Sequence, residues 1–300
     1  STHIARHYSR GVLTRLRIAM EAARLQGDLN HITGDIHFIA MALDPARTIL
    51  TVHDCIPLTR TKGLRRRILR YFWFRMPARR SACVTVISEK TRREFLEHVS
   101  IDPSRVVVIP NCVAPEFVPG PVREPDPASI RILQIGTTEN KNLDVVCAAL
   151  SGMPCTLQII GRLTERQNAL LAEHEIRYEN LYGISQEALA LCYRTADIVT
   201  FVSTYEGFGM PVIEAQASGT PVITSDLSPM REIAGAGACL VDPMDAVAVR
   251  EAVSRLVRDA TYRTAVIRNG LKNVEQYTPG SVAENYAEIY RKVLSGTFKV

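Results

Sequence analysis

The chain has 300 residues, of which 46% are hydrophobic and 22% are charged, the proportions of a soluble globular protein with room for two α/β domains. A net charge of +5 permits an anionic ligand or a membrane surface as a partner without requiring either. No apolar run has the length of a membrane span and the first residues are not a signal peptide, so we expect a cytoplasmic protein, at most peripheral at the inner membrane face.

The cysteines predict neither a disulfide framework nor a metal site. They are odd in number, scattered along the chain and never in a C-x-x-C pair, which is typical of free thiols in a reducing compartment. They are Cys55, Cys83, Cys112, Cys147, Cys155, Cys192 and Cys239.

The first part of the chain predicts a helix and then a strand that ends at a histidine. Apolar residues recur at helical spacing from Val12 to Gln26. The stretch TILTVHDCIPL predicts a β-branched strand that runs into a loop at His53. A histidine at the carboxyl end of a strand is well placed to contact a ligand, although an isolated histidine is more often structural.

A strongly basic segment follows, with nine cations and no acidic residue between Ile56 and Ser88. Aliphatic and aromatic residues lie among these cations. Two interpretations of residues 62–80 stay open: an interfacial helix on an anionic membrane surface, or a core helix whose arginines form its solvated face. No nucleic-acid motif accompanies the segment, so nucleic acid is not an expected partner. The cations are Arg60, Lys62, Arg65, Arg66, Arg67, Arg70, Arg75, Arg79 and Arg80.

Proline marks the expected domain boundary. Six prolines occur from Pro110 to Pro127, a density at which neither a sheet nor a helix continues. We therefore expect a first domain at residues 1–118 and a second at residues 119–280, followed by a final helix in residues 281–300.

The second domain has strands that end in glycine before a helix, the arrangement in which α/β sheets bind phosphate. RILQIG ends at Gly136 and CTLQIIG ends at Gly161. Lys141 is the nearest cation to the first loop, and Arg162 follows the second. From these residues alone, a solvated loop lysine is the simpler interpretation of Lys141.

The stretch FVSTYEGFGMPVIEAQASGTPVITSD predicts a strand, a glycine loop, a short helix over 210–218 and a second strand. Pro211 suits the first helical position and Gly219 a left-handed helix end. A helix N-terminus binds phosphate, while the carboxylates of Glu206 and Glu214 accept hydrogen bonds from vicinal hydroxyls. These features fit a nucleotide sugar. A solvated Glu206 and a Glu214 that complements the helix dipole are the simpler explanation from the bare residues.

The segment E-G-F-G-M-P-V-I-E-A-Q-A-S-G-T-P-V resembles the E-x7-E signature of the retaining GT-B glycosyltransferases of family four. The resemblance implies an α/β fold of the GT-B class, with two doubly wound Rossmann-like domains and a cleft between them. It implies that Glu206 contacts hydroxyls of the transferred sugar and Glu214 the nucleotide ribose. The amides that would contact the sugar and its phosphates are those of Gly207, Phe208, Gly209 and Met210.

Other segments resemble the same family. VHDCIPL implies that His53 lies beside the sugar and the acceptor, and Lys141 resembles the lysine that binds the diphosphate. NLYGISQEALALCYRTADIVTFVS resembles the segment whose backbone holds the base. The final helix resembles one that crosses back onto the first domain. The remaining donor-binding residues that the resemblance implies are Gly136, Thr137, Gly183, Ile184 and Ser185.

The sequence also departs from the family pattern. Thr137 stands where some members have an arginine, and Asn140 replaces an arginine often found before the lysine, so Arg162 would supply the missing charge. Family members open with a strand and a glycine-rich loop, whereas this sequence begins with a helix. We therefore expect a trimmed start or a short variant, which binds the donor but transfers sugar weakly.

The resemblance implies a hexosyltransferase that moves a sugar from a UDP- or GDP-sugar to an acceptor hydroxyl of a glycan or glycolipid with retention of configuration. Glu206, His53 and Lys141 would be its catalytic residues. No metal or other cofactor is expected, because Lys141 and helix amides would supply the positive charge. Two alternatives stay open: a nucleotide-sugar epimerase and a non-catalytic nucleotide-sugar-binding module.

Overall fold

The computed structural model describes residues 11–121 and 124–298, which form two compact units. Within the described residues, unit 1 consists of residues 11–110 and 282–298, and unit 2 of residues 111–121 and 124–281. The chain thus leaves unit 1 after Pro110 rather than at residue 118, and it returns to unit 1 within its last helix. All seven cysteines are free thiols, as the sequence predicts.

Unit 1 contains a parallel sheet of four strands that follow chain order, β1-β2-β3-β4. Every residue of β2 and β3 is buried, as expected for parallel strands covered on both faces. Leu50, Val84 and Phe95 belong to its core. The strands are β1 (Asn30–Ile32), β2 (Thr48–Val52), β3 (Cys83–Val86) and β4 (Val106–Val108).

The helices of unit 1 differ in detail from the prediction. The first helix ends at Arg24 rather than at Gln26, and the basic segment is a run of α-helix, π-helix and α-helix. The α-helices are α1 (Val12–Arg24), α2 (Ile56–Arg60), α3 (Gly63–Leu69), α4 (Met76–Arg79) and α5 (Glu89–His98); the π-helix is η3 (Arg70–Arg75), and the 3-10 helices are η1 (His37–Ala42), η2 (Pro45–Arg47) and η4 (Pro103–Arg105).

Unit 2 contains a six-stranded parallel sheet in the order β10-β9-β8-β5-β6-β7. The chain therefore builds the sheet outward from β5 in one direction and then, from β8, in the other, which is the doubly wound arrangement. Ile132, Leu157 and Ile198 lie in its core. The strands are β5 (Ile130–Ile135), β6 (Cys155–Ile160), β7 (Tyr178–Leu181), β8 (Ile198–Phe201), β9 (Val222–Ser225) and β10 (Cys239–Val241).

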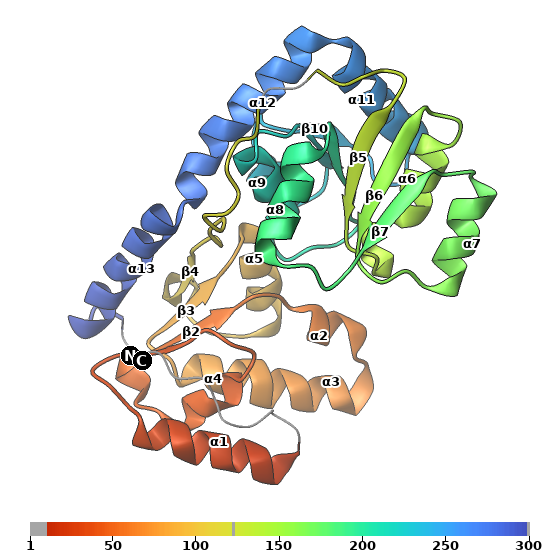
Figure 1. The fold of residues 1–300 in the computed structure, drawn as a ribbon. Helices are drawn as coiled ribbons and strands as arrows, with labels where there is room; N and C mark the ends of the chain where they lie inside the picture. The colour runs from red at the N-terminus through yellow and green to blue at the C-terminus, as the bar shows by residue number, and fades with distance from the viewer. Residues whose placement is uncertain (1–10, 122–123, 299–300) are drawn as a thin grey trace. The chain divides into compact units, whose positions relative to one another are not determined.

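The helices of unit 2 form two groups. Helix α6 packs with α7 and α11, whereas α9 packs with α8, α10 and α12 (Figure 1). Right-handed crossovers place helices from the two winding directions on opposite faces of the sheet. The helices are α6 (Leu143–Leu150), α7 (Glu165–Glu173), α8 (Gln186–Thr195), α9 (Met210–Ala217), α10 (Met230–Ala234), α11 (Ala246–Arg258) and α12 (Ala260–Val274), with the 3-10 helices η5 (Glu139–Lys141) and η6 (Glu275–Tyr277).

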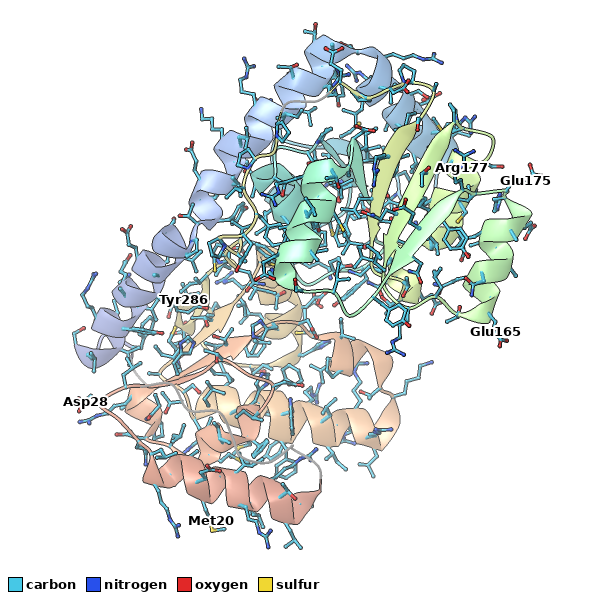
Figure 2. All side chains as sticks on the ribbon, viewed as in Figure 1. Met20, Asp28, Glu165, Glu175, Arg177 and Tyr286 are labelled. Carbon is cyan, nitrogen blue, oxygen red and sulfur yellow. The ribbon has the colours of Figure 1, made fainter. Side chains whose placement is uncertain are left out.

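The last helix, α13 (Pro279–Leu294), starts in unit 2 and continues in unit 1. Its tyrosines contact a half-buried histidine of β1. The His31 ring lies 5.1 Å from that of Tyr286, which is labelled in Figure 2, and its Nδ1 lies 2.8 Å from the Tyr290 hydroxyl. The other ring nitrogen lies 2.7 Å from Thr51 Oγ1 on β2. Burial lowers the pKa of His31 to about 4, so this contact is made by a neutral imidazole at neutral pH.

Candidate active site

The candidate donor residues gather where the strand order of unit 2 reverses. β5 and β8 are neighbours in the sheet although they are far apart in the chain. The loop after β5 carries Gly136 and Lys141, and the loop after β8 carries Glu206. Ligands of open α/β sheets bind outside the carboxyl ends of the strands at such a reversal.

Lys141 lies across the first loop because Gly136 leaves room for it. A Cβ atom at Gly136 would lie 2.9 Å from Lys141 Cγ, and the residue has a φ of +87°, so both space and backbone require glycine here. The Lys141 ammonium lies 4.6 Å from the ring centroid of Phe201, which adds a cation–π contact.

Lys141 and Glu206 form an ion pair with 2.6 Å between Nζ and Oε1. Their side chains are 18% and 17% exposed, so the pair is screened less by solvent than a surface pair. Asn140 Nδ2 donates to the same Glu206 oxygen at 3.1 Å and to the Tyr205 carbonyl at 3.0 Å. The structure thus brings together two residues that lie 65 positions apart in the chain.

Glu214 lies on the buried face of α9 and is 8% exposed. Its Oε2 accepts a 2.7 Å hydrogen bond from the hydroxyl of Tyr193 on α8. Burial raises the pKa of Glu214, while the Tyr193 hydrogen bond and the Lys141 charge act in the opposite direction. A buried carboxylate with a single hydroxyl partner keeps capacity for further donors.

The glycine loop before α9 leads into a helix without a side-chain cap. Gly209 occupies the N-cap position with a φ of +122°, and the helix starts at Met210, with Pro211 second rather than first as predicted. Pro211 has no N–H and the Val212 amide donates to the Gly209 carbonyl at 2.9 Å, so Met210 supplies the first-turn amide that suits an anion. Phe208 is buried, with its ring edge-to-face on Tyr277 at 5.8 Å, so its side chain faces the interior and only its backbone suits a ligand contact.

The loop after β6, which begins at Gly161, contacts Thr137 of the loop after β5. A Cβ atom at Gly161 would lie 2.8 Å from Thr137 Cγ2, and the Thr137 hydroxyl donates to the Arg162 carbonyl at 2.7 Å. The Arg162 guanidinium stacks over the Tyr182 ring, 4.8 Å from its centroid. It therefore lies beside the loop that starts at Gly183.

The loop predicted to hold the base runs into α8. Gly183 has a φ of +64°, with no atom within 4 Å of the position of a Cβ. Ser185 is the N-cap of α8, and its Oγ accepts a hydrogen bond from the Ala188 amide at 3.3 Å. Ile184 lies between them, so the backbone of all three residues is held by a turn and a cap.

His53 lies in unit 1, directly after β2. Its Nε2 is 2.8 Å from the Thr33 carbonyl, and a carbonyl accepts only from a protonated ring nitrogen. This contact assigns the proton to Nε2 and leaves Nδ1 as an acceptor in the neutral ring. The role of His53 stays a prediction.

Comparison with known proteins decides the family. Residues 124–273, which are 150 of the 300, match the family model described as glycosyl transferases group 1, and residues 2–117 match that of glycosyltransferase family 4. The chain belongs to the group 1 glycosyl transferases. The predicted family is thereby confirmed.

Relatives of this glycosyltransferase include bacterial mannosyltransferases. The serotype-specific mannosyltransferase WbdA of Escherichia coli is 22% identical over 89% of this chain and 36% of its own length. The O-antigen chain mannosyltransferase RfbU of Salmonella typhimurium is 26% identical over 79% of this chain and 69% of its own length. This chain thus spans about a third of the first relative and about two thirds of the second.

The solved structures show the fold. Anabaena HepE in complex with UDP and glucose superimposes with a TM-score of 0.77 at 14% identity, over 93% of this chain and 82% of that one. At this identity the likeness carries the fold alone. Together with two parallel sheets, it confirms the predicted GT-B class.

Sequence reasoning missed two residues of the glycosyltransferase site. Asn140 was interpreted only as a missing cation, whereas its amide holds Glu206 and Tyr205. Tyr193 went unnoticed because its partner, Glu214, is 21 positions away on another helix. A buried tyrosine near a helix end was the available signal, since a buried hydroxyl usually has a partner.

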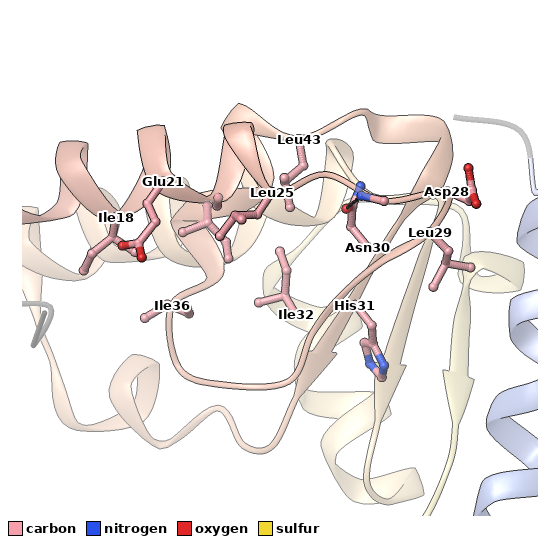
Figure 3. A pocket seen from close by; sticks show the side chains of 13 residues that line it. Ile18, Glu21, Leu25, Asp28, Leu29, Asn30, His31, Ile32, Ile36 and Leu43 are labelled. Atoms are coloured by element: carbon pink, nitrogen blue, oxygen red, sulfur yellow. Dashed lines mark hydrogen bonds between the residues drawn. The ribbon is translucent and has the colours of Figure 1, made fainter. Parts of the chain in front are cut away.

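A cavity of 360 Å³ lies in unit 1, between α1, η1 and β1 (Figure 3). Its walls are both apolar, with Ile18, Ile32 and Leu43 among them, and polar, with Asn30 and His31 on β1. His53 does not line it. The cavity is therefore separate from the one candidate catalytic residue of unit 1.

The described residues contain neither a helix suited to cross a membrane nor a side-chain cluster suited to a metal ion. Across residues 11–121 and 124–298, no helix is both long and apolar enough to cross a membrane. The same residues hold no group of three or more His, Cys, Asp or Glu side chains suited to a metal ion. Independence from metal stays a prediction.

Proposed function

We propose that this glycosyltransferase moves a hexose from a UDP- or GDP-sugar to an acceptor hydroxyl of a glycan or glycolipid, with retention of configuration. The observation that carries the proposal is the Lys141–Glu206 pair at the reversal of strand order in unit 2. A cation, a carboxylate and an uncapped helix N-terminus lie there on neighbouring loops. These groups match the diphosphate and the hydroxyls of a nucleotide sugar.

The chemistry assigned to this site is charge stabilisation. When the bond between the sugar and the diphosphate breaks, negative charge grows on the leaving phosphate oxygen. Lys141 and the amides of residues 207–210, at the start of α9, would stabilise that charge without a metal ion. Glu206 holds the sugar hydroxyls rather than acting as the nucleophile, as the family resemblance implies.

The acceptor side is assigned to His53. With its proton on Nε2 and held by the Thr33 carbonyl, its Nδ1 accepts a hydrogen bond from a sugar or acceptor hydroxyl. The acceptor oxygen forms the new bond on the face that the diphosphate leaves, which retains the configuration. The names of the relatives favour mannose or glucose as the sugar and a surface glycan as the acceptor.

We also propose that the basic segment 62–80 attaches the enzyme to an anionic membrane surface at the cytoplasmic face. The exposed fractions of Leu64 and Phe72 are 71% and 51%. Arg65, Arg66 and Arg67 are exposed on α3 with Leu64, whereas Phe72 lies on η3. Exposed apolar side chains among cations are typical of interfacial helices. Leu69 and Trp73 are partly buried against the core of unit 1, and Phe74 is fully buried in it.

The test is turnover of a panel of UDP-, GDP- and ADP-sugars with and without glycan and glycolipid acceptors. Transfer that requires an acceptor supports the proposal. Inversion or hydrolysis of the donor without an acceptor would instead identify an epimerase. Donor binding without any turnover, in the presence of every acceptor, would identify a binding module.

A further inference from the structure

Tyr193 joins two helices of the donor site. It lies on α8, which begins directly after the loop of Gly183, and its hydroxyl donates to Glu214 on α9 at 2.7 Å. Tyr193 is fully buried and Glu214 nearly so. The hydrogen bond therefore forms in an environment where it is stronger than in water.

The two carboxylate oxygens of Glu214 have different surroundings. Oε2 accepts the hydrogen bond from Tyr193. Oε1 has no hydrogen-bond partner among the described residues. It is not one of the fully buried side-chain atoms without a partner, which means that part of its surface is exposed. It is therefore open to solvent, and it is the oxygen available to a ligand hydroxyl.

The Tyr193 hydroxyl has a fixed position because the rest of the residue is held. The Tyr193 carbonyl accepts a hydrogen bond from Thr220 Oγ1 at 2.7 Å. Its ring packs edge-to-face against Phe117, with centroids 5.3 Å apart. Because the backbone and ring of Tyr193 are both held, its hydroxyl has a defined position and can fix the orientation of the Glu214 carboxylate.

We propose that Tyr193 is the positioning residue of the donor site, which holds Glu214 so that Oε1 accepts hydrogen bonds from the ribose hydroxyls of the nucleotide. This inference rests on the proposed function, because it assumes that Glu214 contacts ribose. Tyr193 itself stays behind the carboxylate and does not contact the donor.

The same hydrogen bond favours the ionised form of Glu214. Burial raises the pKa of Glu214, and the groups that lower it are Tyr193 from α8 and Lys141 from the loop after β5. Loss of the Tyr193 hydroxyl removes one of these two effects, so the pKa rises further. An ionised carboxylate accepts more strongly than a protonated one. On acidification, the nucleotide affinity of a variant without the Tyr193 hydroxyl should therefore begin to fall at a higher pH than that of the parent.

The experiment is a calorimetric titration of UDP and GDP into the parent and Tyr193→Phe from acid to neutral pH. We expect affinity roughly tenfold weaker at neutral pH, as for loss of a hydrogen bond to a charged group, and a pH midpoint moved upward. Tyr262→Phe is the matched control. It removes a hydroxyl that is hydrogen-bonded to Cys239 in the same unit. This variant should bind UDP and GDP as the parent does.

A Glu214→Gln background separates positioning from general support of the fold. If Tyr193 acts through the Glu214 carboxylate, Tyr193→Phe should change nucleotide affinity little in that background. An equal loss in both backgrounds, or an unchanged pH midpoint, would overturn the positioning role. If Tyr193→Phe does not fold, Thr220→Val, which releases the Tyr193 carbonyl, should give a smaller loss with the same upward midpoint shift, and an unmoved midpoint would overturn the inference.

Failure of the proposed function gives a different result. If Glu214→Ala binds UDP and GDP as the parent does, the donor assignment itself is wrong. If Glu214→Ala weakens binding while Tyr193→Phe does not, the donor site stands and only the role of Tyr193 is refuted.

Discussion

Lys141 Nζ and Glu206 Oε1 lie 2.6 Å apart at the reversal of strand order in unit 2. In the proposed donor site, a diphosphate that binds Lys141 shares the ammonium with Glu206, whose Oε1 also accepts from Asn140. We therefore propose that phosphate binding and sugar recognition are coupled through this ion pair.

The two glutamates of the signature should have separable effects. Glu214→Ala should weaken nucleoside diphosphate binding by roughly tenfold, because an acceptor for the ribose hydroxyls is lost. Glu206→Ala should leave free nucleotide affinity nearly intact and depress transfer. Calorimetry and turnover measure the two effects, with exposed Glu232→Ala as the control. Nucleotide binding like the parent by both variants would show the assignment to be wrong.

Glu214 should cost stability in return for binding. Its pKa is raised in the folded chain, so its favourable contribution to folding is present below the unfolded pKa and is lost as pH rises through the folded pKa. Glu214→Gln should therefore melt at a higher temperature than the parent at neutral pH, while the difference shrinks on acidification. Calorimetric melts across pH measure this, and a lower Tm of the variant at neutral pH would contradict it.

Removal of metal should leave activity intact. In the proposed mechanism, the positive charge at the diphosphate comes from Lys141 and the start of α9 rather than from a bound ion. Turnover in EDTA should match untreated enzyme. Complete loss that magnesium or manganese restores would refute the metal-independent mechanism.

Membrane binding should depend on both charge and exposed apolar residues of α3 and η3. Vesicles with anionic lipids should bind the protein and neutral vesicles should bind it weakly, with attraction that falls as salt shortens the screening length from about 8 Å. Leu64→Ser with Phe72→Ser should weaken sedimentation with anionic vesicles. Val247→Ser, at an exposed site of unit 2, is the control. Equal binding to both vesicle types would instead support the interpretation of the segment as a core helix whose arginines form its solvated face.

The sequence predicted those elements whose signals are local. Gly209, Pro211 and Gly219 define the ends of α9 within a residue, because helix starts and stops depend on backbone conformation at single positions. Domain edges were less predictable. The proline-rich stretch begins where the units divide, at Pro110, and prolines alone did not indicate at which end of the stretch the boundary lies.

Contacts between distant residues were beyond sequence reasoning. Lys141 and Glu206 were each named, but their pairing depends on the position of β5 beside β8. Asn140 shows the limit more sharply. The sequence comparison indicates only that Asn140 lacks the charge of an arginine at this position. In the structure, its amide donates two hydrogen bonds to the loop of Glu206.

The most direct test of the account follows a donor labelled at its anomeric carbon through turnover by the parent and by Lys141→Ala. Lys272→Ala, on α12, is the matched control. We expect the labelled sugar to be found on the acceptor with its anomeric configuration retained. Turnover by Lys141→Ala should be at least about 100-fold slower than by the parent, because stabilisation of the leaving charge is lost. Inverted product, or turnover by Lys141→Ala equal to that of the parent, would contradict the central claim.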